Sequence, residues 1–335
     1  MDAQERVHLV GSVPLDDCEQ VFRGVSASLG DHLVRIPDGE TGERTNWVGW
    51  QLPRLLSNPN LEIVGSDSDT YTAGERIGVS DGANPANLSL GDLGYAEAAK
   101  ASYAVFNRLQ RSGEIPAHVR FQVCLPTPVA ISHLYIESAL QADFEAQYET
   151  RLLLELDDIV AAIPATELAV QWDTAVEFAL LEGVMPTYIE DVYQGIVERL
   201  LRLCAAVPVD VEMGFHLCYG DAGHRHFCEP EDMGHLVAVA KAIVEASRRP
   251  VHWIHMPVPR TRDDDAYFRP LAQLELPPVT RLYLGLVHYS DGEAGVQRRC
   301  AAAREFAADF GIATECGFGR RPQDTVARLM ELHKL

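Results

Sequence analysis

Short apolar runs rich in β-branched residues alternate along the chain with longer stretches in which apolar residues recur every three or four positions. The first pattern is typical of buried strands, and the second of helices with one buried face. In the stretch 189–205, for example, Val192, Ile196 and Leu200 fall on one such face. The alternation predicts βα units built around a parallel sheet.

The predicted elements follow one another regularly. Eight strands are expected, at 7–14, 34–40, 119–126, 167–174, 209–219, 251–259, 281–288 and 311–319. Helices are expected at 15–29, 43–56, 96–111, 143–162, 189–205, 230–246, 263–271, 293–310 and 322–333. Eight strands, each followed by a helix, predict a single (β/α)8 TIM barrel over residues 1–335.

One segment departs from this rhythm. Residues 58–93 follow the second predicted strand, are rich in Gly, Ser, Asp and Asn, and are too long for a plain connection. We interpret them as a long insertion that crosses the barrel mouth as a lid, with 61–64 as an extra strand. A mobile surface loop is the open alternative.

Composition narrows the class of protein. The 335 residues include 28 basic and 49 acidic side chains, a net charge of −21, which phosphate backbones would repel. A nucleic-acid partner is therefore not expected. No apolar run approaches the roughly 18 residues that span a bilayer, and the first residues do not resemble a signal peptide. The seven cysteines have no disulfide-framework spacing, so we expect a cytoplasmic protein without a membrane partner. The oligomeric state is left open.

Polar residues interrupt the apolar strands mainly near their C-terminal ends. These residues are Ser12, Asp38, Glu40, Asp173, His216, Cys218, His255, His288, Glu315 and Cys316. In a barrel those ends surround one mouth, where barrel enzymes place their active sites. The shared position predicts an enzyme with its site at that mouth.

The segment His216-Leu217-Cys218 carries the most distinctive chemistry. Residues two apart on a strand project to the same side, so the imidazole and the thiol can reach one point. Nitrogen and sulfur ligands suit zinc, and Cys316 offers a third soft donor at the end of another strand. The alternative is that both cysteines are merely buried core residues.

A series of short motifs resembles the C-terminal barrel of cobalamin-independent methionine synthase and its single-barrel relatives, in the same order and over nearly the whole chain. The motifs are Val10-Gly11-Ser12-Val13-Pro14, Asp38-Gly39-Glu40 followed by Glu43-Arg44 and Asn46, Pro126-Thr127-Pro128-Val129, Gln171-Trp172-Asp173, His216-Leu217-Cys218-Tyr219, Leu286-Val287-His288, and Glu315-Cys316-Gly317 with Arg320.

The resemblance implies roles for individual residues. It implies that His216, Cys218 and Cys316 bind zinc, and that His288 takes part in acid–base work near the transferred methyl group. It also implies that the amino and carboxylate groups of a homocysteine-like thiol contact Ser12, Glu40 and Asp173. The implied activity is a zinc-dependent methyl or alkyl transfer from a methyl donor to this small thiol, activated as its thiolate.

Two departures from the family pattern affect this interpretation. The family takes a further zinc ligand, a glutamate, from the strand at 251–259, which contains no carboxylate here. We expect His255 to serve as the fourth protein donor instead, since imidazole is an accepted zinc ligand. The two-barrel synthases also use an N-terminal barrel in binding the folate donor. This sequence has no counterpart of it, which leaves the donor and the acceptor open.

Two alternatives to a zinc-dependent transferase remain open. A metal-free barrel enzyme resembling uroporphyrinogen decarboxylase would act on a carboxylated small molecule and would need an arginine-rich mouth. The arginines available for it are Arg35, Arg44, Arg260 and Arg320. A non-catalytic binding barrel is the other alternative. Metal analysis separates both from the zinc enzyme.

Overall fold

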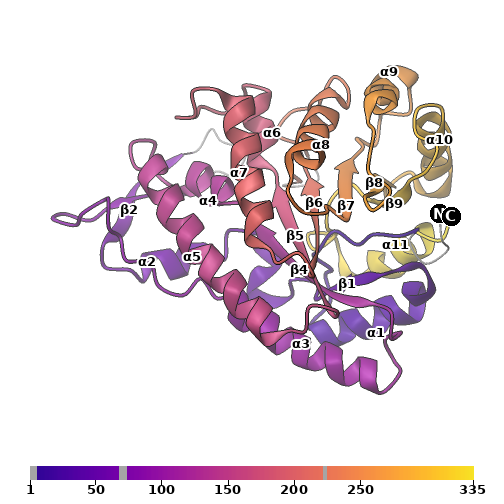
Figure 1. The fold of residues 1–335 in the computed structure, drawn as a ribbon, viewed down its shortest axis with the longest axis horizontal. Helices are drawn as coiled ribbons and strands as arrows, with labels where there is room; N and C mark the ends of the chain where they lie inside the picture. Colours follow the sequence, from indigo (N-terminus) through magenta and orange to yellow (C-terminus); the bar gives the residue numbers. More distant parts are fainter. Residues whose placement is uncertain (1–5, 68–73, 222–224) are drawn as a thin grey trace.

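A curled sheet of seven parallel strands forms the centre of this mixed α/β protein. The computed structural model describes residues 6–67, 74–221 and 225–335. The strands are β1 (Arg35–Pro37), β4 (Arg120–Pro126), β5 (Leu168–Thr174), β6 (Glu212–Leu217), β7 (Trp253–Pro257), β8 (Arg281–Val287) and β9 (Gly311–Thr314), and they pair in this order (Figure 1). Each lies within or close to a predicted strand.

Helices cover the outside of this sheet. The longer ones are α1 (Cys18–Leu29), α3 (Tyr95–Arg111), α5 (Gln141–Ala162), α7 (Val192–Ala206), α8 (Gly234–Ala246) and α10 (Gly292–Arg304). The shorter ones are α2 (Gln51–Leu56), α4 (Pro128–Tyr135), α6 (Val176–Leu181), α9 (Asp265–Phe268) and α11 (Val326–Leu332), with 3₁₀ helices at Gly30–His32, Gly42–Asn46, Arg269–Gln273 and Gln323–Thr325.

Side-chain caps and apolar faces explain the main helices. Asp17, Asp191 and Asp264 each precede a helix and accept a hydrogen bond from the backbone N–H three residues later. Such a cap satisfies one of the N–H groups that a helix leaves unpaired at its start. The face of α1 that packs on the sheet carries Val21 and Phe22, both fully buried.

The first predicted strand, 7–14, is not a regular strand. It makes only isolated parallel bridges, one from Val7 to Ile312 of β9 and one from Ser12 to Gly39 just after β1. These bridges place the segment between the two edge strands of the sheet.

Side chains replace the missing ladder of this segment. The carbonyls of Leu9 and Val10 accept hydrogen bonds from the side-chain amide of Gln122, at 3.0 and 3.2 Å. The amide of Gln171 also donates to the Val10 carbonyl. Because buried carbonyls need a partner, these two glutamines hold the part of the segment that lies between its two bridges.

Two helices, α4 and α6, are not predicted by the sequence pattern. Every residue of α4 is buried, and five of the six in α6 are buried. A helix that is apolar on all sides shows no period of 3.6 residues, so its sequence cannot be distinguished from a buried strand or loop. Both helices directly follow strands, and the end of α4 forms part of the wall around the site described below.

The excursion at 58–93 contains a hairpin of β2 (Leu61–Asp67) and β3 (Gly74–Val79), which projects from one end of the molecule (Figure 1). Residues 68–73 lie outside the described part of the chain. The guanidinium of Arg76 donates to the carbonyls of His133 and Leu134, so the hairpin rests on α4. Farther along, Leu88 N–H donates to Gln147 of α5. The described residues of the excursion thus contact α4 and α5, and none of them lines the pocket presented below.

The sheet brings selected side chains into one row inside the curl. Asp173 pairs in register with His216, and His216 with His255. Side chains at register positions of adjacent strands project to the same face. Three strands therefore place a carboxylate and two imidazoles side by side near their C-terminal ends.

The layer below this row depends on a glycine. A Cβ added to Gly214 of β6 would lie 2.1 Å from the ring of Trp253, which is fully buried on β7. The Gly214→Ala variant should therefore lower the free energy of unfolding by about 1–3 kcal/mol, the usual cost of overpacking a core. Denaturant unfolding measures this, and Gly91→Ala, where the added Cβ meets open space, is the control. Equal stability of the two variants would contradict this packing.

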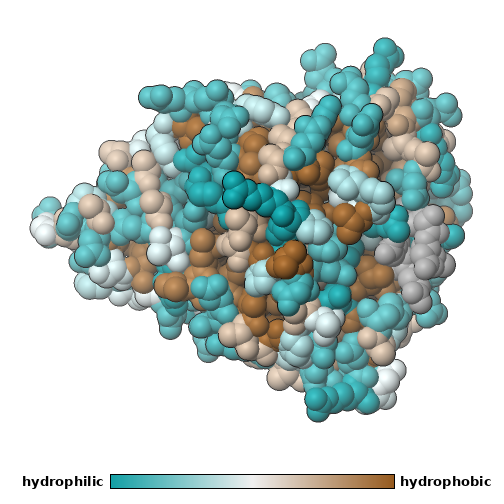
Figure 2. Space-filling model, viewed as in Figure 1, coloured by the Kyte–Doolittle hydropathy of each residue, from teal (hydrophilic) through white to brown (hydrophobic). Residues whose placement is uncertain are grey.

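Among the described residues, no helix combines the length and apolar character that crossing a membrane requires. On the face shown in Figure 2, apolar residues appear as separate areas among hydrophilic ones.

Candidate metal and substrate site

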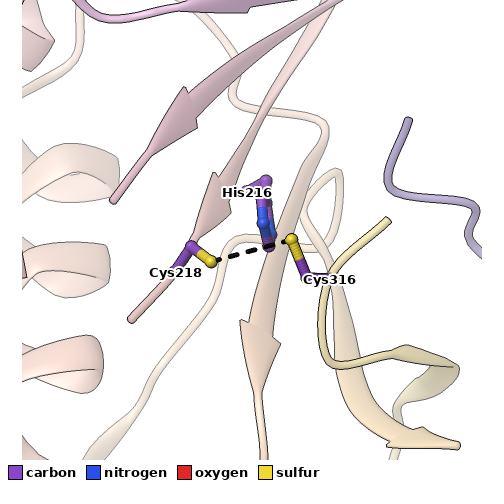
Figure 3. Close-up of side chains that lie close together, drawn as sticks. All are labelled: His216, Cys218 and Cys316. Carbon is purple, nitrogen blue, oxygen red and sulfur yellow. Dashed lines mark hydrogen bonds between the residues drawn. The ribbon is translucent and has the colours of Figure 1, made fainter. Parts of the chain in front are cut away.

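His216, Cys218 and Cys316 converge at the C-terminal ends of β6 and β9. One ligand atom from each residue lies within 4.8 Å of the others, and the two sulfurs are 4.0 Å apart. Figure 3 shows His216 on β6, Cys218 just beyond the end of that strand, and Cys316 facing them from the loop after β9. This group of soft donors can hold a metal ion.

Two features of the group fit zinc. The Nε2 atom of His216 is buried and has no hydrogen-bond partner, which is costly unless something else binds there. All seven cysteines are free thiols. The sulfurs of Cys218 and Cys316 are 4.0 Å apart, close to the roughly 3.8 Å between two sulfurs that bind one tetrahedral zinc ion with bonds of about 2.3 Å. The donors are therefore spaced for a shared ion.

The protein surroundings favour the neutral forms of two of these donors, Cys218 and His216. Contact with the Cys316 thiol, together with burial, raises the pKa of Cys218 well above its ordinary value. Burial is also the main cause that lowers the pKa of His216 well below its ordinary value, so this imidazole is neutral. Neutral imidazole is the form that binds metals. A bound cation would reverse the effect on the thiol and favour its thiolate.

His255, expected as a fourth donor, lies behind His216. One ring nitrogen, Nδ1, is 2.7 Å from Nδ1 of His216, and the other, Nε2, is 3.0 Å from the carbonyl oxygen of Thr314. With both nitrogens engaged, His255 has no atom left for an ion at the three-residue group. The structure therefore brings together three of the four expected donors.

A pocket opens directly beside these three donors. About 740 Å³ of space lies between its lining residues when the open solvent at its mouth is counted. Ser12, Glu40 and Asp173, the residues expected to bind substrate, all line it. Its other walls come from the segment at 46–48, from the end of α4, and from residues after β5, β6 and β9.

Glu40 reaches this pocket through an unusual turn. Gly39 and Glu40 both have left-handed backbone conformations, with φ of 82° and 48°. Such a conformation is uncommon for a residue with a side chain and is often found at functional sites. Asp38 holds the turn, because it accepts hydrogen bonds from the Glu40 N–H and from both terminal nitrogens of Arg44.

Burial raises the pKa of both carboxylates in the pocket. Burial, aided by Asp38, raises the pKa of Glu40 to about 7 against the opposing charges of Arg44 and Arg320. Burial and the nearby charge of Glu40 raise the pKa of Asp173 well above its ordinary value. A cation that enters between them would relieve this repulsion, so the pair favours an ammonium group.

Ser12 sits where glycines leave room for it. Its hydroxyl accepts a hydrogen bond from the Gly319 N–H at 3.2 Å, and an added Cβ on Gly317 would lie 2.3 Å from the same oxygen. The loop that carries Cys316 is thus packed directly on the segment that carries Ser12.

Gln171 is a site residue for which the sequence predicts no role. It lies two positions before Asp173 on β5, so the two side chains project to the same side of the strand. Its side-chain amide donates to Asp173 at 2.8 Å, while its oxygen lies 2.8 Å from Nε2 of His8. Gln171 therefore fixes the carboxylate from below. Polar residues two positions apart on a buried strand are the signal that could have identified it.

The arginines do not form an open anion site. Arg35 pairs with Glu212, Arg44 with Asp38, and Arg320 with Asp221. Arg260 donates to the Ser290 hydroxyl. Of these four arginines, only Arg320 lines the pocket. This arrangement gives little support to an arginine-rich mouth for a carboxylated substrate.

His288, expected to act in catalysis, lies in a neighbouring polar pocket. Its Nε2 atom is 2.9 Å from the Val258 carbonyl, and its Nδ1 atom is 3.4 Å from a carboxylate oxygen of Glu315. It lines a pocket with His226, Arg260 and Arg321, separate from the one that contains the three donors. The structure does not place His288 beside the three donors.

No family model and no curated protein matches this chain. Among solved structures, the chain is similar to a Listeria monocytogenes protein provisionally named as a vitamin-B12-independent methionine synthase. The two share 13% sequence identity over 100% of this chain and 97% of the other, with a TM-score of 0.55. At this identity the similarity shows a related fold and nothing finer.

Proposed function

We propose that this protein is a zinc-dependent transferase that moves a methyl or alkyl group from a donor to a small amino-acid thiol such as homocysteine. One observation carries the proposal: His216, Cys218 and Cys316 line the same pocket as Glu40 and Asp173. Donors for a soft metal and a pair of carboxylates suited to an ammonium are the two halves of a site for an amino-acid thiol.

In the proposed reaction, three residues hold the metal and two bind the substrate's ammonium group. His216, Cys218 and Cys316 would hold zinc, which when bound supplies the charge that keeps a substrate thiol in its thiolate form at neutral pH. Glu40 and Asp173 bind the ammonium group and thereby fix the distance between it and the sulfur. The substrate thiol loses its proton to water, and its sulfur forms a bond to the alkyl carbon. The donor's bond to that carbon breaks, and the donor leaves with the electron pair of that bond.

The fold contributes to the proposal. We interpret the seven-stranded sheet, together with the segment at 7–13 that bridges its edges, as a (β/α)8 barrel. The name of the structurally similar Listeria protein agrees with the proposed reaction. Free thiols at the site suit a reducing compartment, so we place the enzyme in the cytoplasm.

A transfer assay tests the function. The zinc-loaded protein is incubated with homocysteine and, in separate reactions, with methylcobalamin or a methyl-folate, and methionine is quantified. We expect methionine with at least one donor, and no O-methylhomoserine when homoserine replaces homocysteine. The proposal would be contradicted by a zinc-loaded protein that forms no thioether with either donor and does not bind homocysteine.

The raised pKa of Glu40 predicts a pH dependence of amino-acid binding. Glu40 is protonated below about pH 7 and ionised above it, and only the ionised form attracts an ammonium. Affinity for methionine, whose sulfur does not titrate, should rise between pH 5.5 and 8, by up to about tenfold per pH unit below the pKa. Calorimetry measures this, and the Glu40→Gln variant should show a weaker dependence. An affinity that falls with pH would contradict the assigned role.

A further inference from the structure

His216 and His255 form a closely packed pair inside the curled sheet. They are register partners on β6 and β7, their ring centroids are 4.8 Å apart, and both are buried. The 2.7 Å between their Nδ1 atoms requires one proton between the two nitrogens, because two bare nitrogens would repel. Which ring carries that proton follows from the third partner.

The third partner is the Thr314 carbonyl. It lies 3.0 Å from Nε2 of His255 and can only accept a hydrogen bond, so Nε2 of His255 carries a proton. His255 is fully buried, and its hydrogen-bond partners among the described residues are another imidazole and a backbone carbonyl, so no anion stabilises a second proton and the ring is neutral. Its Nδ1 is therefore bare and must accept a hydrogen bond from Nδ1–H of His216.

Because Nδ1 of His216 carries the proton, the other nitrogen of this ring, Nε2, carries none. A neutral ring with its proton on Nδ1 has a free lone pair on Nε2. That atom is buried without a hydrogen-bond partner and is the nitrogen left for the group formed with Cys218 and Cys316. A lone pair without a proton is what a metal ligand must present.

The hydrogen bonds that run from the Thr314 carbonyl through His255 to His216 form a relay, and Thr314 also links this relay to the third donor, Cys316. Its hydroxyl donates a 2.6 Å hydrogen bond to the carbonyl of Cys316, two residues along the same loop. One residue of β9 thus anchors His255 through its carbonyl and Cys316 through its side chain. The relay and the cysteine loop are set by the same strand end.

We propose that His255 is a positioning residue: together with the Thr314 carbonyl it fixes His216 in the Nδ1–H tautomer and directs the free Nε2 toward Cys218 and Cys316. This role replaces direct ligation by His255. The tautomer is a property of the metal-free chain, and only its use for a metal rests on the proposed function.

The tautomer can be measured without any metal. In the metal-free protein labelled with 15N-histidine, long-range 1H–15N spectra should show His216 protonated on Nδ1 and bare on Nε2, and His255 with the opposite pattern. A His216 ring protonated on Nε2 would overturn the proposal. This arm uses the unaltered chain, so it does not depend on whether a variant folds.

Zinc affinity supplies the second arm. Partners that orient a ligating histidine are usually worth 10- to 100-fold in metal affinity, so His255→Phe should weaken zinc binding by about that factor in competition with a chelator. His255→Gln should stay within a few-fold of the unaltered protein, because its amide can donate to Thr314 and accept from His216. His333→Phe, which replaces another buried histidine at the end of α11, should leave zinc affinity unchanged.

The two arms separate the proposals. Equal zinc affinity of His255→Phe and the unaltered protein would overturn the positioning role. A metal-free chain that shows the expected tautomers but binds no zinc would support the relay and contradict the zinc enzyme.

Discussion

Replacing Cys316 with serine should release zinc from the protein and reduce thiol transfer by more than about 100-fold. Changes to residues behind a ligand already cost about 10- to 100-fold, and Cys316 is one of the three donors that the site brings together among the described residues. The hydroxyl of serine is a poor replacement for a thiolate, because it keeps its proton at neutral pH.

The fold should survive this change. Cys316 lies in the loop after β9, and its sulfur contacts only Cys218 and Arg320 among the hydrogen-bond partners of the described residues. Thermal unfolding should therefore move by no more than a few degrees. Cys300→Ser, which alters a buried cysteine on α10, is the control that should keep both zinc and activity. A Cys316→Ser protein that retains zinc and full transfer would remove the metal mechanism.

Removing either carboxylate of the pocket should weaken binding of the amino-acid thiol without affecting zinc. Loss of one charge-assisted hydrogen bond costs about 1.5–3 kcal/mol, which corresponds to about 10- to 150-fold in affinity for Glu40→Gln or Asp173→Asn. Because the two carboxylates share one ligand group and the charge of Glu40 raises the pKa of Asp173, the double variant should lose less than the sum of the single losses.

A ligand without the amino group is the matched control. The affinity for 4-mercaptobutyrate, which is homocysteine without its amine, should be the same or higher in both variants, since no ammonium is lost and a buried charge is removed. Competition calorimetry at constant zinc loading measures both ligands. Unchanged homocysteine affinity in Glu40→Gln and in Asp173→Asn would show that the pocket does not bind the amino group through these residues.

The strands and the three donors were predictable from the sequence for one physical reason. Residues in parallel strands are buried on both faces, so an interrupting polar residue such as Asp173 or His216 is conspicuous. Strand parity placed His216 and Cys218 on the same side, and the predicted barrel topology brought Cys316 to them. The structure brings together these three residues as expected.

Burial and spacing along a strand do not predict which partners a polar side chain contacts. His255 lies on the expected strand, but its role depends on hydrogen bonds to His216 and to the distant Thr314 carbonyl. His288 likewise ends the expected strand, yet a contact with Glu315 holds it in the adjacent pocket. Such preferences arise from tertiary contacts that spacing along a strand does not encode.

The first segment shows a different limit. Its apolar residues predicted a strand, but the carbonyls of Leu9 and Val10 are satisfied by side chains of Gln122 and Gln171. More than 100 residues separate these partners in the chain. No local pattern reveals that a glutamine side chain will replace a strand ladder.

Zinc K-edge X-ray absorption of the purified protein, before and after addition of homocysteine, tests the central claim most directly. The account predicts zinc bound by two sulfurs at about 2.3 Å and one histidine nitrogen at about 2.0–2.1 Å, and a third sulfur once homocysteine is present. Homoserine should add no sulfur. A protein that binds no zinc, or whose zinc has the same sulfur count with and without homocysteine, would contradict it.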